Sequence, residues 1–252
     1  MITIKNKNWQ LEHVEAVFFD KDGTLIDSHV YWGKIIEIRS AALVAALDPQ
    51  NKELYSELCR VMGWSLREKR LSPSGPIALV QRDVVIEIVM KYLLKSGFSI
   101  SEQEIGGIFT DVHKGFIGNM LPYIKIIAGV EPMLMRLKKR GVKLAVITTD
   151  AQNNTLEILQ YLDIDKYFDL VVTKESTKES KPGGMPALFA LKSLKVKAEN
   201  SICIGDAPMD ILMGENARLK ATIGVATGQI TLEELMKYTK YFINNLSEVE
   251  IL

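Results

Sequence analysis

Short apolar runs alternate with helix-length segments over the second half of the chain, and this alternation limits the available folds more than any other feature. The apolar runs are Lys143–Ile147, Leu170–Val172, Ser201–Ile204 and Ala221–Val225. The segments between and after them carry apolar residues at helical spacing: Asn153–Leu162, Met185–Leu194, Asp210–Ala217 and Thr231–Tyr238. Strands and helices that alternate in this way predict a parallel sheet with helices on both faces, joined by right-handed crossovers.

An earlier apolar run, Val14–Phe19, ends abruptly at the polar turn Asp20–Thr24. Its β-branched and aromatic residues are typical of a strand that is covered on both faces. We therefore expect this run to join the same sheet and to place Asp20 at the sheet edge. The predicted fold class is α/β, with a doubly wound, Rossmann-like parallel sheet.

The residues between this first strand and the rest of the sheet follow a different pattern. Residues 29–125 lack convincing strands and contain amphipathic stretches, which are Trp32–Leu47, Lys52–Met62, Ile77–Lys95 and Ser101–Gly115. Ser101 and Glu104 match a capping box, and the Pro73–Pro76 segment interrupts the helices. We expect residues 1–28 and 126–252 to form an α/β core, with residues 29–125 as an inserted helical cap domain. Six residues of the insertion could face a substrate, namely His29, Tyr31, Trp32, Arg39, His113 and Lys114. Because aromatic and aliphatic residues at helical spacing are more often core than binding surface, these residues receive no functional role.

Polar side chains follow the expected strands directly, and together they offer carboxylates, a hydroxyl and an ammonium. These residues are Asp20, Asp22, Thr148, Lys181, Asp206 and Asp210. Ligands of open parallel sheets bind at the carboxyl ends of the strands, so we expect these side chains to converge on one edge. Carboxylate oxygens are the ligands that Mg²⁺ prefers, and the predicted cofactor is therefore Mg²⁺.

Such an edge suits a phosphate ester. Mg²⁺ and Lys181 would offset the charge of the ester, while Thr148, Thr149 and the turn at Gly23 would contact its remaining oxygens. Asp20 could then attack phosphorus to form an aspartyl-phosphate, and Asp22 could protonate the leaving oxygen and later deprotonate water. Gly23 gives the turn the backbone freedom needed to aim both acids.

Four motifs resemble those of the haloacid dehalogenase superfamily of aspartate-nucleophile phosphotransferases. They read FFDKDGTL, VITTD, KP at Lys181, and IGDAPMD, and they occur in the order of that family over the whole chain, apart from detail in the insertion. The resemblance implies that Asp20 is the nucleophile and Asp22 the general acid and base. It also implies that Mg²⁺ is held by the Asp20 side chain, the Asp22 main-chain carbonyl and Asp206, with Asp210 supporting the site and Lys181.

The insertion looks like the cap of the phosphoglycolate-phosphatase and β-phosphoglucomutase branch, which implies helices that close over the site and select the substrate. The branches that dehalogenate or cleave phosphonates usually lack an aspartate at the position of Asp22, so the resemblance favours hydrolysis of a phosphate ester. Lys181 is followed by Pro-Gly-Gly where many relatives have Pro-x-Pro. Lys174 and Lys178 therefore stay open as alternatives for the catalytic lysine.

The predicted function is Mg²⁺-dependent hydrolysis of a small phosphomonoester. A phosphomutase of the same superfamily and a non-catalytic phosphate-binding regulatory protein stay open as alternatives. The chain has 31 basic and 31 acidic residues, so no net charge attracts nucleic acid or an anionic membrane. We expect a small phosphorylated metabolite as the partner and a monomer or homodimer. No signal sequence and no run of about 18 apolar residues is present, which predicts a cytoplasmic protein.

Overall fold

The computed structural model describes residues 1–252 and separates into two compact units. The first unit contains residues 1–27 and 125–252, and the second contains residues 28–124. These bounds lie within one residue of those expected for the core and the insertion. Each unit has its own cluster of buried hydrophobic residues.

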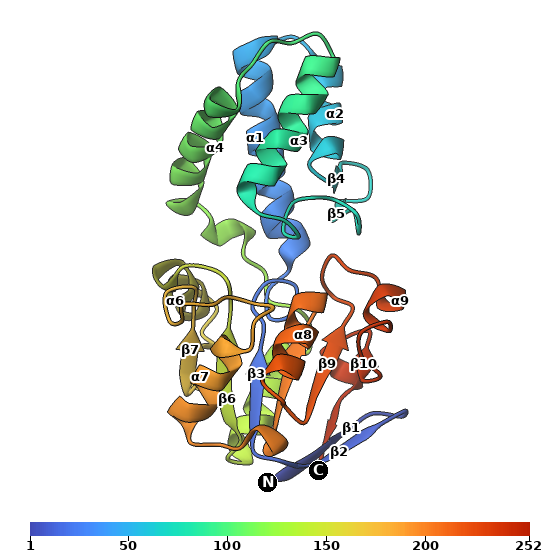
Figure 1. Cartoon of the computed structure of the whole chain (residues 1–252), viewed down its shortest axis with the longest axis vertical. Coiled ribbons are helices and arrows are strands. Elements are labelled where there is room, and N and C mark those ends of the chain that lie inside the picture. The colour runs from blue at the N-terminus through green and yellow to red at the C-terminus, as the bar shows by residue number, and fades with distance from the viewer. The chain divides into compact units, whose positions relative to one another are not determined.

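The first unit is built on a six-stranded parallel sheet with the strand order β10-β9-β8-β3-β6-β7 (Figure 1). In that order the strands are Phe242–Ile243, Ala221–Val225, Ser201–Gly205, Ala16–Phe19, Lys143–Ile147 and Leu170–Val172. The chain runs outward from β3 through β6 to β7, then returns to the other side of β3 to form β8 and β9. The strand order therefore reverses at β3, which is where α/β sheets bind ligands. The prediction of a doubly wound parallel sheet is confirmed.

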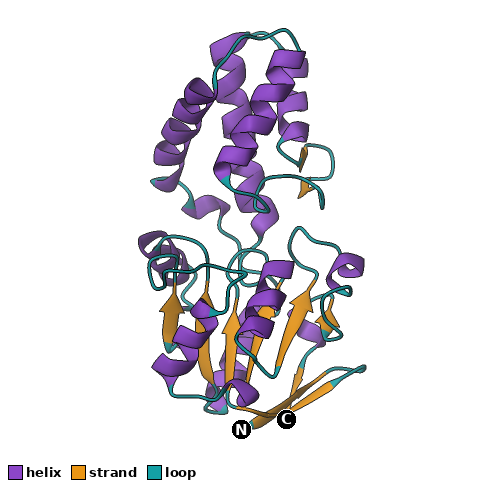
Figure 2. Ribbon diagram, viewed as in Figure 1, coloured by secondary structure: helices purple, strands orange, loops and turns teal.

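Helices lie on both faces of this sheet (Figure 2). They are α5 (Val130–Lys139), α6 (Gln152–Tyr161), α7 (Met185–Leu194), α8 (Pro208–Asn216) and α9 (Leu232–Leu235). Helix α7 packs on β6 and β7, and α8 packs on β8 and β9. Alternate side chains of β3, those of Ala16 and Phe18, join the hydrophobic cluster that α7 and α8 cover. Short 3₁₀ helices occur at Leu121–Tyr123, Asp165–Tyr167, Ala198–Asn200 and Leu246–Glu248.

The expected strand Val14–Phe19 is wrong in one respect, because it is two strands in different sheets. β2 (Gln10–Val14) pairs with β1 (Ile2–Lys5) in an antiparallel sheet that β11 (Glu250–Ile251) completes, whereas β3 begins at Ala16. His13 has a φ of 55°, in the left-handed region, so the extended backbone is interrupted before the sheet begins. β2 ends at Val14 and β3 begins at Ala16, so the break falls at Glu15, and a single polar residue inside the predicted run did not reveal it.

The second unit consists of α1 (Ser28–Leu47), α2 (Lys52–Val61), α3 (Arg82–Lys95) and α4 (Glu102–Ile117). A two-stranded hairpin, β4 (Trp64–Ser65) with β5 (Arg70–Leu71), joins α2 to α3 and was not predicted. The capping box of Ser101 and Glu104 is confirmed. The expected helix start at Ile77 is wrong, because the loop that contains Pro73 and Pro76 extends to Gln81. No helix of either unit is both long and apolar enough to span a bilayer.

Candidate active site

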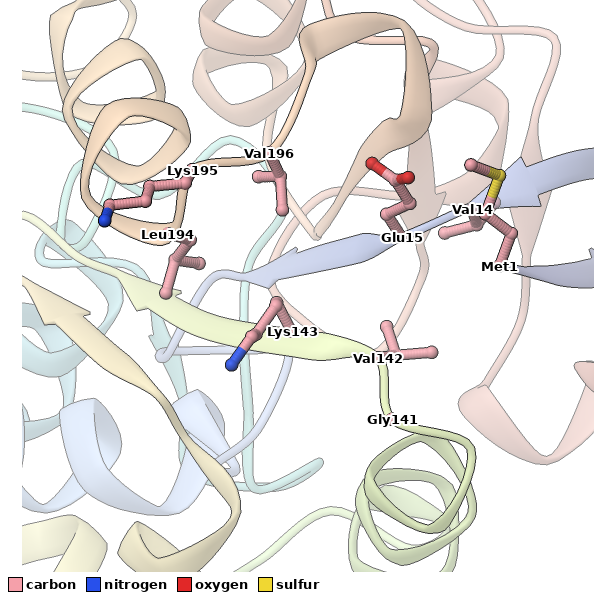
Figure 3. A pocket seen from close by; sticks show the side chains of 9 residues that line it. All are labelled: Met1, Val14, Glu15, Gly141, Val142, Lys143, Leu194, Lys195 and Val196. Atoms are coloured by element: carbon pink, nitrogen blue, oxygen red, sulfur yellow. The ribbon is translucent and has the colours of Figure 1, made fainter.

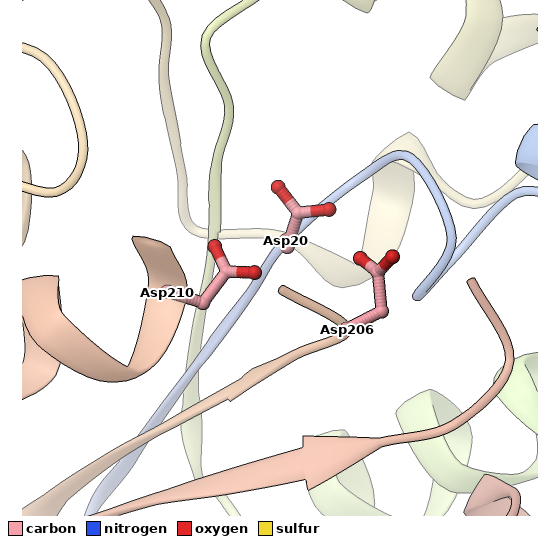
Figure 4. A group of neighbouring side chains, drawn as sticks. All are labelled: Asp20, Asp206 and Asp210. Carbon is pink, nitrogen blue, oxygen red and sulfur yellow. The ribbon is translucent and has the colours of Figure 1, made fainter. Parts of the chain in front are cut away.

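Three aspartates gather at the carboxyl end of the central strands (Figure 4). Asp20 follows β3, Asp206 follows β8, and Asp210 lies in the first turn of α8. Phe19 pairs with Ile204 across the two parallel strands, so the chain leaves both strands at the same level. One carboxylate oxygen from each aspartate lies within 4.8 Å of the other two. The strand register therefore creates the cluster of acids that the sequence predicted at this edge.

Lys181 is the cation of this cluster. Its Nζ lies 2.5 Å from Oδ1 of Asp20 and 2.7 Å from Oδ1 of Asp210, and its side chain is 2% exposed. The other two candidate lysines are exposed, and the Nζ of Lys174 lies 4.0 Å from Glu175. The structure thus brings Lys181, and neither Lys174 nor Lys178, into contact with the acids.

Asp210 holds Lys181 and the start of α8 in place. Its Oδ1 accepts a hydrogen bond from Lys181, and its Oδ2 accepts one from the backbone N–H of Ala207 at 3.1 Å. A Cβ added to Gly205 would lie 2.4 Å from the Asp210 carboxyl group, so a side chain at position 205 would displace it. Both oxygens of Asp210 are engaged, which fits the supporting role expected from the sequence.

Two glycines make room for the Asp206 carboxylate. A Cβ would lie 2.3 Å from Oδ2 of Asp206 if added to Gly23, and 1.7 Å from it if added to Gly228. Gly23 also has a φ of 88°, which favours glycine. Thr227 fixes the two loops together, since its Oγ1 donates a 2.6 Å hydrogen bond to the carbonyl of Gly23. The sequence analysis missed Gly228 and Thr227, which follow β9 and could have been found by inspecting the end of that strand.

Burial and repulsion among the acids shape the electrostatics of the cluster. Burial raises the pKa of Asp20 to about 6, although the Lys181 charge opposes this rise. The pKa of Asp206 lies well above its usual value because of burial first and then the charges of Asp20 and Asp210. Burial acts to lower the pKa of Lys181, but Asp20 and Asp210 outweigh it and raise that pKa, so the ammonium stays charged. Three acids face one lysine, and the site has an excess of negative charge.

This donor set fits a hard divalent cation. It offers oxygen ligands without sulfur or imidazole, which is the preference of Mg²⁺, and the repulsion that raises the pKa of Asp206 is relieved by added positive charge. Because the oxygens of Asp210 are engaged, Asp20 and Asp206 are the side chains able to hold the ion. The Asp22 main-chain carbonyl is the third ligand that the family resemblance implies, and this ligand stays a prediction.

Asp22 lies in an ion-pair network that the sequence analysis did not foresee. The Nζ of Lys21 lies 2.9 Å from Oδ1 and 2.8 Å from Oδ2 of Asp22, and 3.2 Å from Oδ2 of Asp150. Lys21 is fully buried. Burial raises the pKa of Asp22, and Lys21 opposes this rise. The available signal was a lysine inside the DKDGT turn and an aspartate at the end of VITTD.

The two threonines after β6 differ in their surroundings. Thr148 is 5% exposed and follows the strand next to β3, and its Oγ1 accepts a hydrogen bond from the N–H of Asp150 at 3.1 Å. Thr149 is exposed. The structure therefore places Thr148 at the same sheet edge as the acids, whereas the Thr149 side chain forms no hydrogen bond with them.

A separate pocket lies at the opposite end of the sheet, where β3 and β6 begin (Figure 3). It has a volume of about 280 Å³, and its charged lining residues are Glu15, Lys143 and Lys195. Both lysines are exposed. Because ligands of parallel sheets bind at the carboxyl ends, we assign this pocket no function.

The chain is similar to known hydrolases and phosphatases, both in sequence and in fold. The model of the haloacid dehalogenase-like hydrolase family matches residues 80–224. A candidate pyrophosphatase, PpaX, of Clostridium perfringens is 39% identical over 222 residues, which cover 88% of each chain. The phosphoglycolate phosphatase of Aquifex aeolicus is 27% identical over 212 residues, covering 84% of this chain and 85% of that protein. The crystal structure of a candidate β-phosphoglucomutase from Thermotoga maritima is similar with a TM-score of 0.66 and 24% identity, over 93% of this chain and 96% of the other.

Proposed function

The chain belongs to the haloacid dehalogenase-like hydrolase family, and from this premise we propose that it is a Mg²⁺-dependent phosphatase that hydrolyses a small phosphomonoester. One observation carries the proposal: the half-buried Asp20 carboxylate is held by Lys181 beside Asp206, at the point where the strand order reverses. A phosphoglycolate phosphatase among the relatives supports a small phosphorylated metabolite as the substrate. Residues 28–124 are the proposed cap, which would select that substrate.

Asp20 is the proposed nucleophile. Its pKa of about 6 leaves the carboxylate ionised at neutral pH, and Lys181 binds Oδ1, so Oδ2 is available for attack. A bond forms between Oδ2 and phosphorus while the bond between phosphorus and the ester oxygen breaks, which leaves an aspartyl-phosphate and an alcohol. Water then attacks phosphorus and regenerates Asp20 with release of phosphate.

Positive charge around Asp20 offsets the charge of the phosphoryl group. Lys181 is fixed by Asp210, so it needs little rearrangement to stabilise charge as it develops, and the buried Thr148 hydroxyl offers a neutral donor at the same edge. When bound to Asp20, Asp206 and the Asp22 carbonyl, Mg²⁺ would supply the charge that lets a carboxylate approach an anionic ester.

Asp22 is the proposed general acid and base. It gives a proton to the leaving oxygen in the first step and takes one from water in the second. Burial favours the protonated form of Asp22. Lys21 favours the ionised form, because it donates a hydrogen bond to Oδ1 and lies within ion-pair distance of Oδ2. These opposing influences suit a group that must release and recover a proton in turn.

A second candidate function is hydrolysis of pyrophosphate. The PpaX relative is 39% identical over most of both chains and its name gives this activity. The nucleophile and the cation site would be the same, but the leaving group would be phosphate instead of an alcohol. Phosphate is a better leaving group than an alkoxide, so Asp22 would matter less for pyrophosphate.

The experiment is a screen of the purified protein with Mg²⁺ and with a chelator. The panel contains phosphoglycolate, sugar phosphates, nucleotides, phosphoamino acids and pyrophosphate, and both free phosphate and isomerised sugar phosphate are measured. We expect chelator-sensitive release of phosphate from one ester class, with a preference of about a hundredfold, and none from the Asp20→Asn variant. A preference for pyrophosphate would favour the second function, isomerised product would indicate a phosphomutase, and no turnover of any compound would favour the regulatory alternative.

A further inference from the structure

The second unit contains a buried arginine that no acid neutralises. Arg39, on α1, is 6% exposed, and its Cζ lies 4.3 Å from the centroid of the Phe109 ring. Its Nε is enclosed and has no hydrogen-bond acceptor. No carboxylate is among the groups whose charge acts on it. Burial of an unpaired charge is costly, and a cation over an aromatic ring offsets only a part of that cost.

A neighbouring arginine adds to the excess of positive charge. Burial and then the charge of Arg82 lower the pKa of Arg39 to about 10, against a smaller effect of the Tyr31 phenol. Arg82 stands at the first position of α3, and its Nη2 donates to the Gly106 carbonyl at 2.9 Å and to Thr110 Oγ1 at 2.8 Å. Both acceptors are neutral, so neither guanidinium is paired with an acid.

A second donor on α1, besides Arg39, also lacks an acceptor. Nε1 of Trp32 is enclosed and has no hydrogen-bond partner. Trp32 precedes Arg39 by seven residues, close to two helical turns, and the two therefore share one face of α1. The other indole groups are satisfied, since Trp9 donates to the Phe242 carbonyl and Trp64 donates to Oε1 of Glu37. Two enclosed N–H donors without an acceptor therefore lie on this one face of α1.

We propose that this face of α1, together with Arg82, is a binding site for an oxyanion, namely a carboxylate or phosphate group of a small ligand. Such a group supplies both the negative charge that the two arginines lack and the acceptor oxygens that Arg39 and Trp32 lack. The Phe109 ring lies over one flat side of the Arg39 guanidinium, so an oxyanion would have to approach its N–H groups in the guanidinium plane. The oxyanion is either free phosphate or a second acidic group of the substrate, and only the latter source rests on the proposed function.

Nuclear magnetic resonance of the full-length, ¹⁵N-labelled protein tests the site directly. The Trp32 Nε1–H and Arg39 Nε–H signals, assigned with the Trp32→Phe and Arg39→Lys variants, are followed while inorganic phosphate or phosphonoacetate is added. We expect saturable shifts of both signals and no shift of the Trp9 and Trp64 indoles. Arg82→Gln, a change at an exposed side chain, should weaken the binding about tenfold. The control is Arg60→Gln, which removes an exposed arginine paired with Glu57 and should leave the affinity unchanged.

Kinetics of the Arg82→Gln variant separate the two sources. A rise of about tenfold in KM for phosphoglycolate, with an unchanged KM for 4-nitrophenyl phosphate, assigns the site to the second acidic group of a substrate. An unchanged KM for both, together with weaker binding of inorganic phosphate, assigns it to free phosphate. The proposal is overturned if neither anion shifts the two signals, or if Arg82→Gln binds both anions as the wild type does. Because the resonances need no turnover, a protein that hydrolyses nothing but binds phosphate here would refute only the proposed function.

Discussion

Replacement of Lys181 by methionine removes the cation of the candidate active site and keeps a side chain of similar length. The Lys181 ammonium contacts Asp20 at 2.5 Å and Asp210 at 2.7 Å, and its side chain and that of Asp210 are each 2% exposed. Without it, buried carboxylates with oxygens within 4.8 Å of one another have no cation between them. Removal of one partner from a buried ion pair costs about 3–5 kcal/mol, so we expect the free energy of unfolding to fall by about that amount at pH 7.5.

The pH dependence of this loss has a definite sign. In the wild type, burial raises the pKa of Asp20 from 3.8 to about 6, and this rise of about two units costs about 3 kcal/mol once the group is ionised. An acid with a raised pKa contributes stability below its unfolded pKa and loses it as the pH rises through the folded value. Lys181 opposes the rise, so Lys181→Met moves the folded pKa higher still. The deficit of the variant should therefore be largest above pH 6 and should shrink as the pH falls toward 4.

Urea unfolding followed by circular dichroism at pH 7.5 and 4.5, with chelator present, measures this effect. The matched control is Lys178→Met, on the same loop and exposed, which should change stability by no more than about 0.5 kcal/mol. We also expect kcat to fall by at least about 10²-fold in Lys181→Met alone, because one stabilising cation is lost. The reasoning is refuted if the two variants unfold at the same urea concentration at pH 7.5, or if the deficit of Lys181→Met grows as the pH falls.

Further predictions concern the loops, the Asp22 network and the helical unit. Gly228→Ala should lower kcat by at least about 10²-fold, because its Cβ would lie 1.7 Å from Asp206 Oδ2. The control Gly224→Ala, whose Cβ has its nearest contact at 3.4 Å, should keep kcat within a few fold of the wild type. Equal kcat values for the two variants in steady-state assays would contradict this. Lys21 is paired with Asp22, the proposed general acid, so Lys21→Met should lower kcat more for an alkyl phosphate than for 4-nitrophenyl phosphate, whose leaving group needs no proton. Equal losses of kcat for the two substrates would show that Lys21 is only structural. Ser101→Ala should reduce the free energy of unfolding in urea by about 1 kcal/mol with no change in kcat, and an unaltered unfolding curve would argue against the capping box.

The sequence predicts the central sheet well because its strands are buried on both faces. Lys143–Ile147, Leu170–Val172 and Ala221–Val225 are strands with the predicted bounds, and each apolar run stops where the backbone reaches the sheet edge. Asp20 and Asp206 are foreseeable for the same reason, since parallel strands carry their following residues to one edge. The small antiparallel sheet was missed because β2 ends at Val14 and β3 begins at Ala16. A single strand over Val14–Phe19 would show nearly the same apolar pattern as these two strands.

The pairing of distant charges lies beyond what a single sequence shows. The contact between Lys21 and Asp150 joins residues on two different loops, and nothing in the local pattern distinguishes Lys21 from a solvated lysine. The same holds for Lys181. The order of the four motifs favoured Lys181 as the catalytic lysine, but its contacts with Asp20 and Asp210 appear only in the fold. Gly228 belongs to this class too, because the space needed by Asp206 is set by a loop that follows a different strand.

Identification of the phosphorylated residue during turnover tests the central claim most directly. The protein is mixed with its preferred ³²P-labelled ester and Mg²⁺, quenched in acid within milliseconds, and digested for peptide mass spectrometry after reduction of the acyl phosphate with borohydride. The account predicts transient ³²P at no more than one phosphoryl group per chain before reduction, and conversion of Asp20 to homoserine after it, with neither in Asp20→Asn. Reduction at another residue, or hydrolysis by Asp20→Asn at the wild-type rate, would contradict it.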